Sequence, residues 1–206
     1  MPVTGPTQNI VTLDLEGVLV PEIWIAVAES TGIDALRRTT RDEPDYDVLM
    51  RGRLALLGQH GLTMSRIAAV IGGLTPMPGA REFLDELRAR TQVVILTDTF
   101  EQFASPLAAQ LGWPTMLCHR LVVEQDRIVD YRLRMPDQKR AAVRAFHGLN
   151  YRVLAAGDSY NDTAMLAEAD AGFLFRSSAN VRDAFPQFPA LEEYDDLLRE
   201  LTARLT

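Results

Sequence analysis

The segment IVTLDLEGVLVPE, residues 10–22, places two acids at the end of an apolar run and directly before a glycine. The run at 10–15 has the length and composition of a buried strand. Asp14 and Glu16 would leave water where this strand ends, which costs free energy unless the two carboxylates find partners. Their position therefore predicts a functional role at the end of a strand.

Apolar runs of strand length recur at residues 93–97, 153–156 and 171–175, with helical patterns between them. Such alternation predicts an α/β fold with a Rossmann-like parallel sheet flanked by helices. Ligands in these folds bind outside the carboxyl ends of the strands. The polar residues at three of these predicted strand ends are Asp14, Thr97, Asp98 and Asp158. We expect them to converge on one crevice.

Two segments break the alternation. Residues 22–78 contain amphipathic helical segments but no convincing strand, which predicts a helical insertion after the first strand. The prolines of TPMPG, residues 75–79, mark the return to the sheet domain. The predicted domains are a core at 1–21 plus 79–206 and an inserted helical unit at 22–78. Two β-rich runs around EQDR predict an antiparallel hairpin at the edge of the sheet.

Charge and composition exclude several classes of partner. With 28 acidic and 21 basic residues, the chain has a formal charge of −7, which argues against a nucleic-acid or anionic-membrane surface. Neither a long apolar span nor a signal-peptide pattern is found. The single cysteine, Cys118, cannot form an internal disulfide. We expect a cytoplasmic location, and the oligomeric state is left open, with a homodimer as one alternative.

The segment GDSYND adds a second acidic strand end, at Asp158. Asp14, Glu16 and Asp158 would repel one another in one crevice, and a cation relieves that repulsion. Oxygen ligands without a His or Cys cluster favour Mg²⁺ before Ca²⁺. The alternative is that GDSYND is only a turn followed by a helix whose N-cap is Ser159 or Asp162.

Thr97 and Lys139 have the chemistry to bind a phosphate. Thr97 follows an apolar run, where its hydroxyl and nearby N–H groups can bind phosphoryl oxygens. Lys139 opens a predicted helix, where the helix dipole disfavours a cation by roughly 0.3 to 1 kcal/mol. This misfit indicates a role for the charge. A capping threonine and a solvated lysine are the structural alternatives.

The sequence resembles the haloacid-dehalogenase-like (HAD) superfamily of aspartate-nucleophile phosphotransferases. The four motifs of that superfamily are matched, in order, by DLEGV, Thr97 in VVILTDTF, Lys139 and GDSYND. The insertion resembles the small cap of the phosphoserine phosphatases. More narrowly, four segments resemble bacterial phosphoserine phosphatases that also act as phosphoserine:homoserine phosphotransferases. These segments are LDLEGVLVPEIWIA, TTRDEPDYDVLM, LTDTF and AAGDSYNDTAML.

The resemblance implies a nucleophile and a metal site. Asp14 would take the phosphoryl group as an aspartyl phosphate, which divides one difficult displacement into two easier steps. Mg²⁺ would be held by Asp14, the backbone carbonyl of Glu16 and Asp158, with Asp162 in support. The implied cofactor is therefore Mg²⁺.

The resemblance also assigns residues to the phosphoryl group. Thr97 and Lys139 would neutralise its oxygens, since phosphoryl transfer is accelerated mainly by positioning and charge stabilisation. Asn161 would lie near the phosphate. Asp98, which directly follows Thr97, is assigned with Asn161 to the substrate-binding residues.

A phosphoserine site needs an acid for the ammonium and an arginine for the carboxylate. Glu22 and Arg53 match the serine-binding acid and arginine of the phosphatases. Tyr46 precedes Arg53 by seven residues, two helical turns, and would wall the same pocket. A helix-start acid and a solvent-facing arginine are the structural alternatives for Glu22 and Arg53.

Glu16 departs from the wider family, which has Asp at this position. The residue there protonates the leaving alcohol and then deprotonates the attacking nucleophile. The narrower family shares the glutamate, so the role is retained. The longer side chain leads to the hypothesis that a shifted base favours an alcohol acceptor over water.

The expected function is a Mg²⁺-dependent phosphatase acting on O-phospho-L-serine, with water or homoserine as acceptor. Alternatives are another small phosphomonoester as substrate, a phospho-receiver domain, or a non-enzymatic amino-acid-binding protein. No P-loop motif occurs, which argues against a P-loop kinase. The histidines have no metal-ligand spacing and are interpreted as incidental; they are His60, His119 and His147.

Overall fold

The computed structural model describes residues 8–39, 42–43 and 45–205. These residues form a seven-stranded sheet in the order β4-β3-β2-β1-β5-β6-β7. The strands are β1 (Gln8–Leu13), β2 (Gln92–Phe100), β3 (Thr115–Glu124), β4 (Arg127–Arg132), β5 (Tyr151–Gly157), β6 (Ala171–Phe175) and β7 (Ala190–Leu191). All neighbouring pairs are parallel except β3 and β4. The predicted α/β fold is confirmed.

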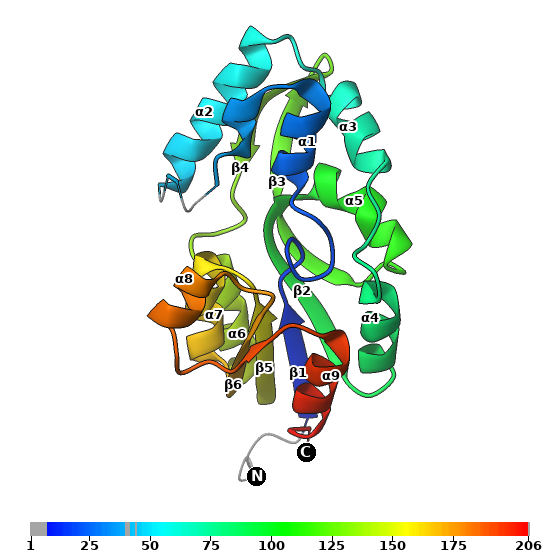
Figure 1. The fold of residues 1–206 in the computed structure, drawn as a ribbon, viewed down its shortest axis with the longest axis vertical. Coiled ribbons are helices and arrows are strands. Elements are labelled where there is room, and N and C mark those ends of the chain that lie inside the picture. The colour runs from blue at the N-terminus through cyan, green and yellow to red at the C-terminus, as the bar shows by residue number, and fades with distance from the viewer. Residues whose placement is uncertain (1–7, 40–41, 44, 206) are drawn as a thin grey trace.

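Helices cover both faces of the sheet (Figure 1). The longer ones that follow the insertion are α4 (Ala80–Arg88), α5 (Glu101–Gln110), α6 (Gln138–Gly148) and α9 (Tyr194–Thr202). Shorter helices are η2 (Tyr160–Asp162), α7 (Thr163–Glu168) and α8 (Ala179–Ala184). Successive side chains of a strand point to opposite faces. Leu13 accordingly packs in the cluster with α4, α5 and α9, whereas Ile10 packs with α6 and α7.

Two predicted strand ends shift. The run at 10–15 ends as strand β1 at Leu13, and Asp14 N–H then donates to the carbonyl of Ala156 at 3.0 Å. In contrast, β2 continues past Thr97 to Phe100. The acids of the opening segment therefore lie in a loop just beyond β1, while the polar residues after Thr97 are still on a strand.

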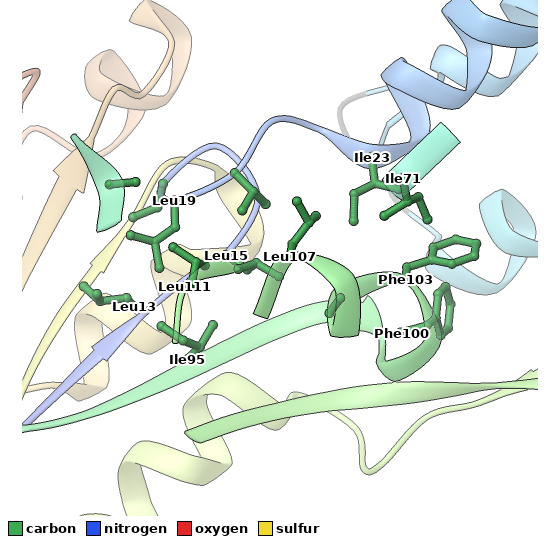
Figure 2. Packing of buried hydrophobic residues seen from close by; sticks show 14 of the residues in the cluster. Leu13, Leu15, Leu19, Ile23, Ile71, Ile95, Phe100, Phe103, Leu107 and Leu111 are labelled. Atoms are coloured by element: carbon green, nitrogen blue, oxygen red, sulfur yellow. The ribbon is translucent and has the colours of Figure 1, made fainter. Parts of the chain in front are cut away.

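The insertion is helical, as predicted: between Glu22 and Pro78 the described residues contain no strand. Its elements are α1 (Ile23–Thr31), η1 (Asp34–Arg37), α2 (Tyr46–Gln59) and α3 (Met64–Gly72). Figure 2 shows Ile23 and Ile71 near Phe103 of α5, in the cluster that continues to Leu13 of β1 and Ile95 of β2. Residues 1–7, 40, 41, 44 and 206 of the predicted domains lie outside the described residues.

The predicted hairpin is confirmed as β3 and β4 at the edge of the sheet. Gln125 and Asp126 form its turn with φ of 47° and 62°, which is typical of tight hairpin turns. The turn reaches the insertion, where the Asp126 carboxylate accepts from the N–H and hydroxyl of Ser65, both at 2.8 Å. Arg51 of α2 pairs with Asp130 of β4 at 2.7 Å. The hairpin therefore anchors the insertion.

No single helix in the described part of the chain is long and apolar enough to cross a membrane. The helices α2 and α3 meet the length and composition criteria only as a pair, and this pair is bent by 106° at its break.

Candidate active site

The loop after β1 brings Asp14 next to β5. The side chain of Asp14 is 5% exposed, at the carboxyl end of the sheet. Gly17 has φ of 77°, and a Cβ at this position would lie 2.6 Å from the carboxyl carbon of Asp158. Only glycine combines this backbone conformation with so close an approach. The pair of loops thus needs Gly17 to bring the carboxylates together.

Three buried carboxylates lie at this point. Asp14, Asp158 and Asp162 each offer an oxygen, and these oxygens all lie within 4.8 Å of one another. Burial, together with the charges of Asp162 and Asp158, raises the pKa of Asp14 well above its usual range, although Lys139 opposes this shift. A dense set of carboxylate oxygens without nitrogen or sulfur ligands suits a hard cation. The group can hold a divalent metal.

Lys139 relieves the same repulsion. Its Nζ lies 2.9 Å from Oδ1 of Asp14, 2.7 Å from Oδ1 of Asp162 and 3.7 Å from Oδ2 of Asp98. Burial alone would lower the pKa of Lys139, but the carboxylates of Asp14 and Asp162 outweigh it and raise the pKa well above the usual range. The solvated alternative is wrong, because the side chain is 3% exposed. The buried ammonium group of Lys139 therefore offsets part of the repulsion between the carboxylates, which the sequence analysis had assigned to a metal ion.

Asp162 has two roles. Its Oδ1 contacts Lys139, and its Oδ2 accepts from the N–H groups of Asp158 and Ser159 at 3.0 and 3.1 Å. The capping alternative for GDSYND therefore holds together with the functional interpretation. A Cβ at Gly157 would lie 2.4 Å from the carboxyl carbon of Asp162, so this position also depends on glycine.

Asp98 connects the strand end to its neighbours. Its carboxylate accepts from Nδ2 of Asn161 at 2.9 Å and from Nε2 of Gln138 at 3.0 Å. Burial works to raise the pKa of Asp98, but the charge of Lys139 and these hydrogen bonds hold it well below its usual range. Thr97, 2% exposed, precedes it and accepts from the N–H of Thr99 at 3.3 Å. The structure thus brings together the predicted phosphate-binding residues.

The Glu16 carboxylate is bound at the start of α1. Its Oε2 accepts from the N–H of Ile23, the first residue of α1, at 2.8 Å. As expected, Glu16 lines one cavity with Asp14 and Asp158, but its carboxylate binds the start of α1, which offers an N–H group that needs an acceptor. Burial, with the charge of Glu22, raises the pKa of Glu16 to about 7. This value is suited to a group that gives and takes a proton near neutrality.

The insertion supplies the other wall of the site. Tyr46 donates its hydroxyl hydrogen to the carbonyl of Asp98 at 2.9 Å, and burial raises the pKa of this phenol. Arg53 is 8% exposed, stacks on Trp24 at 4.6 Å and donates to the carbonyl of Arg38 at 2.7 Å. Burial lowers the pKa of Arg53 to about 10. The solvent-facing alternative for Arg53 is therefore wrong.

A cavity of about 100 Å³ collects almost every predicted site residue. Those that line it are Asp14, Glu16, Glu22, Tyr46, Arg53, Thr97, Asp98, Lys139, Asp158 and Asn161. Asp162 lies behind this wall, where its contact with Lys139 keeps it part of the site. Glu22 is also the residue just before α1, so its helix-start interpretation holds as well.

Several contacts were missed from the sequence. His119, interpreted as incidental, is 5% exposed, with Nε2 3.5 Å from Oδ1 of Asp98. Its Nδ1 accepts from the N–H of Arg134 at 3.1 Å, which turns Nε2 toward the site. Gln138 and Thr99 also escaped notice. Gln138 is next to Lys139 and Thr99 follows Asp98, so their positions beside predicted site residues could have identified both. His119 reaches the site only through the register of β3.

The geometry agrees with a comparison against protein families. A model of the haloacid dehalogenase-like hydrolases matches residues 9–170. The chain belongs to this family. The match includes Asp14, Thr97, Lys139 and Asp158, so it covers the motifs on which the sequence resemblance rested.

Relatives of this haloacid dehalogenase-like hydrolase carry specific names. A phosphoserine phosphatase of Pseudomonas syringae pv. tomato is 62% identical over 193 residues, 93% of this chain and 81% of the relative. Phosphoserine phosphatase ThrH of Pseudomonas aeruginosa is 62% identical over 194 residues, 94% of this chain and 95% of the relative.

Solved phosphoserine phosphatase structures share the fold. A phospho-aspartyl intermediate analogue has a TM-score of 0.79 at 18% identity, covering 94% of this chain and 98% of that one. A substrate-bound complex has a TM-score of 0.78 at 19% identity, covering 97% and 99%. This likeness agrees with the mostly parallel sheet and its helical layers.

Proposed function

We propose that this chain is a Mg²⁺-dependent phosphoserine phosphatase that forms an aspartyl phosphate on Asp14 and also transfers the phosphoryl group to homoserine. One observation carries the proposal: Lys139 contacts Asp14 at 2.9 Å in a cavity that Glu22 and Arg53 also line. A phosphoryl site and a site for a small zwitterion thus share one space. The two relatives at 62% identity are named phosphoserine phosphatases.

The donor would bind across the cavity. The carboxylate of Glu22 suits the ammonium group, and the buried guanidinium of Arg53 suits the carboxylate of phosphoserine. Tyr46 closes the side of the pocket through its hydrogen bond to Asp98. The phosphoryl group then lies over the carboxyl end of the sheet, near Thr97 and Lys139.

In the first half-reaction, a carboxylate oxygen of Asp14 attacks phosphorus. The bond between phosphorus and the serine oxygen breaks, and its electron pair stays on that oxygen, which takes a proton from Glu16. Lys139, the Thr97 hydroxyl and the Asn161 amide stabilise the charge on the phosphoryl oxygens.

The metal site is proposed at Asp14, Asp158 and the backbone carbonyl of Glu16, with Asp162 in support. The fit rests on three buried carboxylates whose oxygens lie within 4.8 Å of one another. When bound, Mg²⁺ neutralises charge on the phosphoryl oxygens and on the aspartates.

In the second half-reaction, water or homoserine attacks the phosphorus of the aspartyl phosphate. Glu16 takes the proton of the attacking oxygen, and the electron pair of the broken bond returns to the Asp14 carboxylate. The released product is inorganic phosphate or phosphohomoserine.

We also propose residues 22–78 as a cap on a core of residues 1–21 and 79–206. Support comes from the helical character of the insertion and from its cavity-lining side chains, which include Tyr46 and Arg53. The cytoplasmic location remains a prediction, and fractionation of cells tests it.

Phosphate release from a panel of phosphoamino acids, with and without homoserine, tests the proposal. Phosphoserine should be turned over many times with Mg²⁺, and EDTA should stop turnover. Rapid-quench mass spectrometry should find a phosphoryl adduct on Asp14, and Asp14→Asn should lack both adduct and turnover. If the protein prefers another phosphomonoester, that compound replaces phosphoserine as the proposed substrate. If it retains a single equivalent of phosphate without turnover, it is a receiver domain.

A further inference from the structure

Thr99 carries a buried hydroxyl that its surroundings do not satisfy. The residue is 4% exposed, and no group among the described residues donates a hydrogen bond to Oγ1. Its backbone is ordinary strand, with the N–H donating to Oγ1 of Thr97 at 3.3 Å. Buried polar groups in native proteins nearly always have partners. A hydroxyl oxygen at a cavity wall that accepts no hydrogen bond from the described residues points to a ligand that donates to it.

The location of this hydroxyl is specific. Thr97 and Thr99 are two residues apart on β2, and both line the active-site cavity. Glu16 lines the same cavity, and the Thr99 hydroxyl lowers the pKa of the Glu16 carboxyl as a hydrogen-bond donor, which leaves the lone pairs of Oγ1 free to accept. Because Oε2 of Glu16 accepts from the N–H of Ile23, Oε1 is the oxygen that would exchange a proton with substrate or water. Thr99 therefore lies beside the proposed acid and base.

Water and an alcohol differ at this position. Each uses a lone pair to attack phosphorus and gives one proton to the base. Water has a second O–H group that needs an acceptor in a dry site, whereas an alcohol has carbon there. A side-chain oxygen next to the base can thus distinguish the two nucleophiles.

Resting on the proposed function, we propose that Oγ1 of Thr99 accepts the second O–H of the water that attacks the aspartyl phosphate, and so favours hydrolysis over transfer to an alcohol. The water oxygen bonds to phosphorus as the bond from phosphorus to the Asp14 oxygen breaks. The electron pair returns to the Asp14 carboxylate, one water proton goes to Glu16, and inorganic phosphate leaves. Thr99 thereby contacts the attacking water in the second half-reaction.

The test compares Thr99→Val, which removes the hydroxyl at nearly constant volume, with Thr99→Ser, which keeps it. Ser177→Ala is a matched control, because Ser177 is also 4% exposed and its Oγ has no partner in the described part of the chain, but it lies outside the cavity-lining residues. Rapid quench measures formation and breakdown of the aspartyl phosphate from phosphoserine. Product analysis with homoserine or methanol measures the partition between hydrolysis and transfer.

We expect Thr99→Val to slow breakdown in water about three- to tenfold, the usual effect of one lost hydrogen bond, with a smaller effect on formation. Transfer should gain relative to hydrolysis. Thr99→Ser should restore breakdown, and Ser177→Ala should change neither rate. Thermal unfolding verifies that each variant is folded.

Other results overturn the inference. If Thr99→Val slows formation or raises KM for phosphoserine with breakdown unchanged, Thr99 binds the donor instead. If Thr99→Val lowers the rates of hydrolysis and transfer equally, or lowers neither, Thr99 does not distinguish water from an alcohol. If wild-type protein forms no aspartyl phosphate at all, the proposed function itself fails, and this outcome is distinct from the others. If the wild-type protein transfers phosphate to no alcohol, the rate at which the aspartyl phosphate breaks down in water decides whether Thr99 has this role.

Discussion

Lys139 reaches from the start of α6 to Asp14, with Nζ 2.9 Å from Oδ1. The same ammonium lies 2.7 Å from Oδ1 of Asp162. One buried cation thus joins the proposed nucleophile to the loop after β5. The unfavourable position of this lysine at a helix start is offset by the carboxylates that surround it.

Lys139→Met should abolish measurable phosphatase activity and destabilise the protein without metal by about 3 to 5 kcal/mol, because it leaves buried carboxylates uncompensated. Mg²⁺ should recover part of the stability but not the activity. Urea unfolding with and without Mg²⁺ measures this. Arg140→Ala removes the next, half-exposed cation and should change neither quantity substantially. Equal losses in both variants would contradict the role of Lys139.

Gly17→Ala should weaken Mg²⁺ binding and reduce turnover at least tenfold, because its Cβ would lie 2.6 Å from Asp158. Gly32→Ala is the matched control, since Gly32 also has positive φ, 72°, but its Cβ would meet nothing within 4 Å. Both variants carry backbone strain of about 1 to 2 kcal/mol. Calorimetric titration measures the Mg²⁺ affinity of both variants. Because both carry the backbone strain, only the contact of the new Cβ with Asp158 should make their affinities differ, and equal affinities would refute this contact.

Tyr46→Phe should raise KM for phosphoserine about three- to tenfold with a smaller change in kcat, because it removes the hydrogen bond from the insertion to the carbonyl of Asp98. Steady-state kinetics measure both constants. Tyr160→Phe is the control, because Tyr160 is 41% exposed and bonds to Asn180 away from the cavity. An unchanged KM in Tyr46→Phe would show that this bond does not hold the pocket closed.

Glu16→Asp should lower the ratio of homoserine transfer to hydrolysis. The shorter side chain withdraws from the N–H of Ile23, to which Oε2 is now bound at 2.8 Å, and the base moves toward the loop after β1. Measuring phosphohomoserine and phosphate from the same reaction gives the ratio. An unchanged ratio would remove the hypothesis that the glutamate favours an alcohol acceptor.

Asp170→Asn should reduce stability near neutral pH by about 0.5 to 1 kcal/mol, a small value because solvent screens this mostly exposed group. Partial burial works to raise the pKa of Asp170, but the N–H of Val153 and the ring of His147 outweigh it and lower the pKa. The ionised form therefore stabilises the fold above the unfolded pKa of about 3.9, and this contribution is lost as pH falls through the lower folded pKa. Unfolding curves from pH 7 to 2 should converge for the two proteins.

Much of the site could be predicted because it follows strand ends. Asp14, Thr97 and Asp158 each come after an apolar run, and parallel strands present their carboxyl ends at one edge. The contacts of Arg53 and His119 could not be predicted in this way. The side chain of Arg53 is buried by stacking on Trp24, and His119 meets Asp98 only through the register of β2 and β3.

The amino-acid sequence by itself determined the alternation of strands and helices as far as β6, the helical insertion, the hairpin and the polar residues after the apolar runs, since these depend on local periodicity and turn chemistry. It did not predict α8, β7 or α9. The tertiary structure alone decided that the Glu16 carboxylate binds α1, that Lys139 joins three aspartates and that no described residue donates to the Thr99 hydroxyl oxygen. These properties depend on distances between segments far apart in the chain. A pattern of residue types does not contain such distances, because packing sets them.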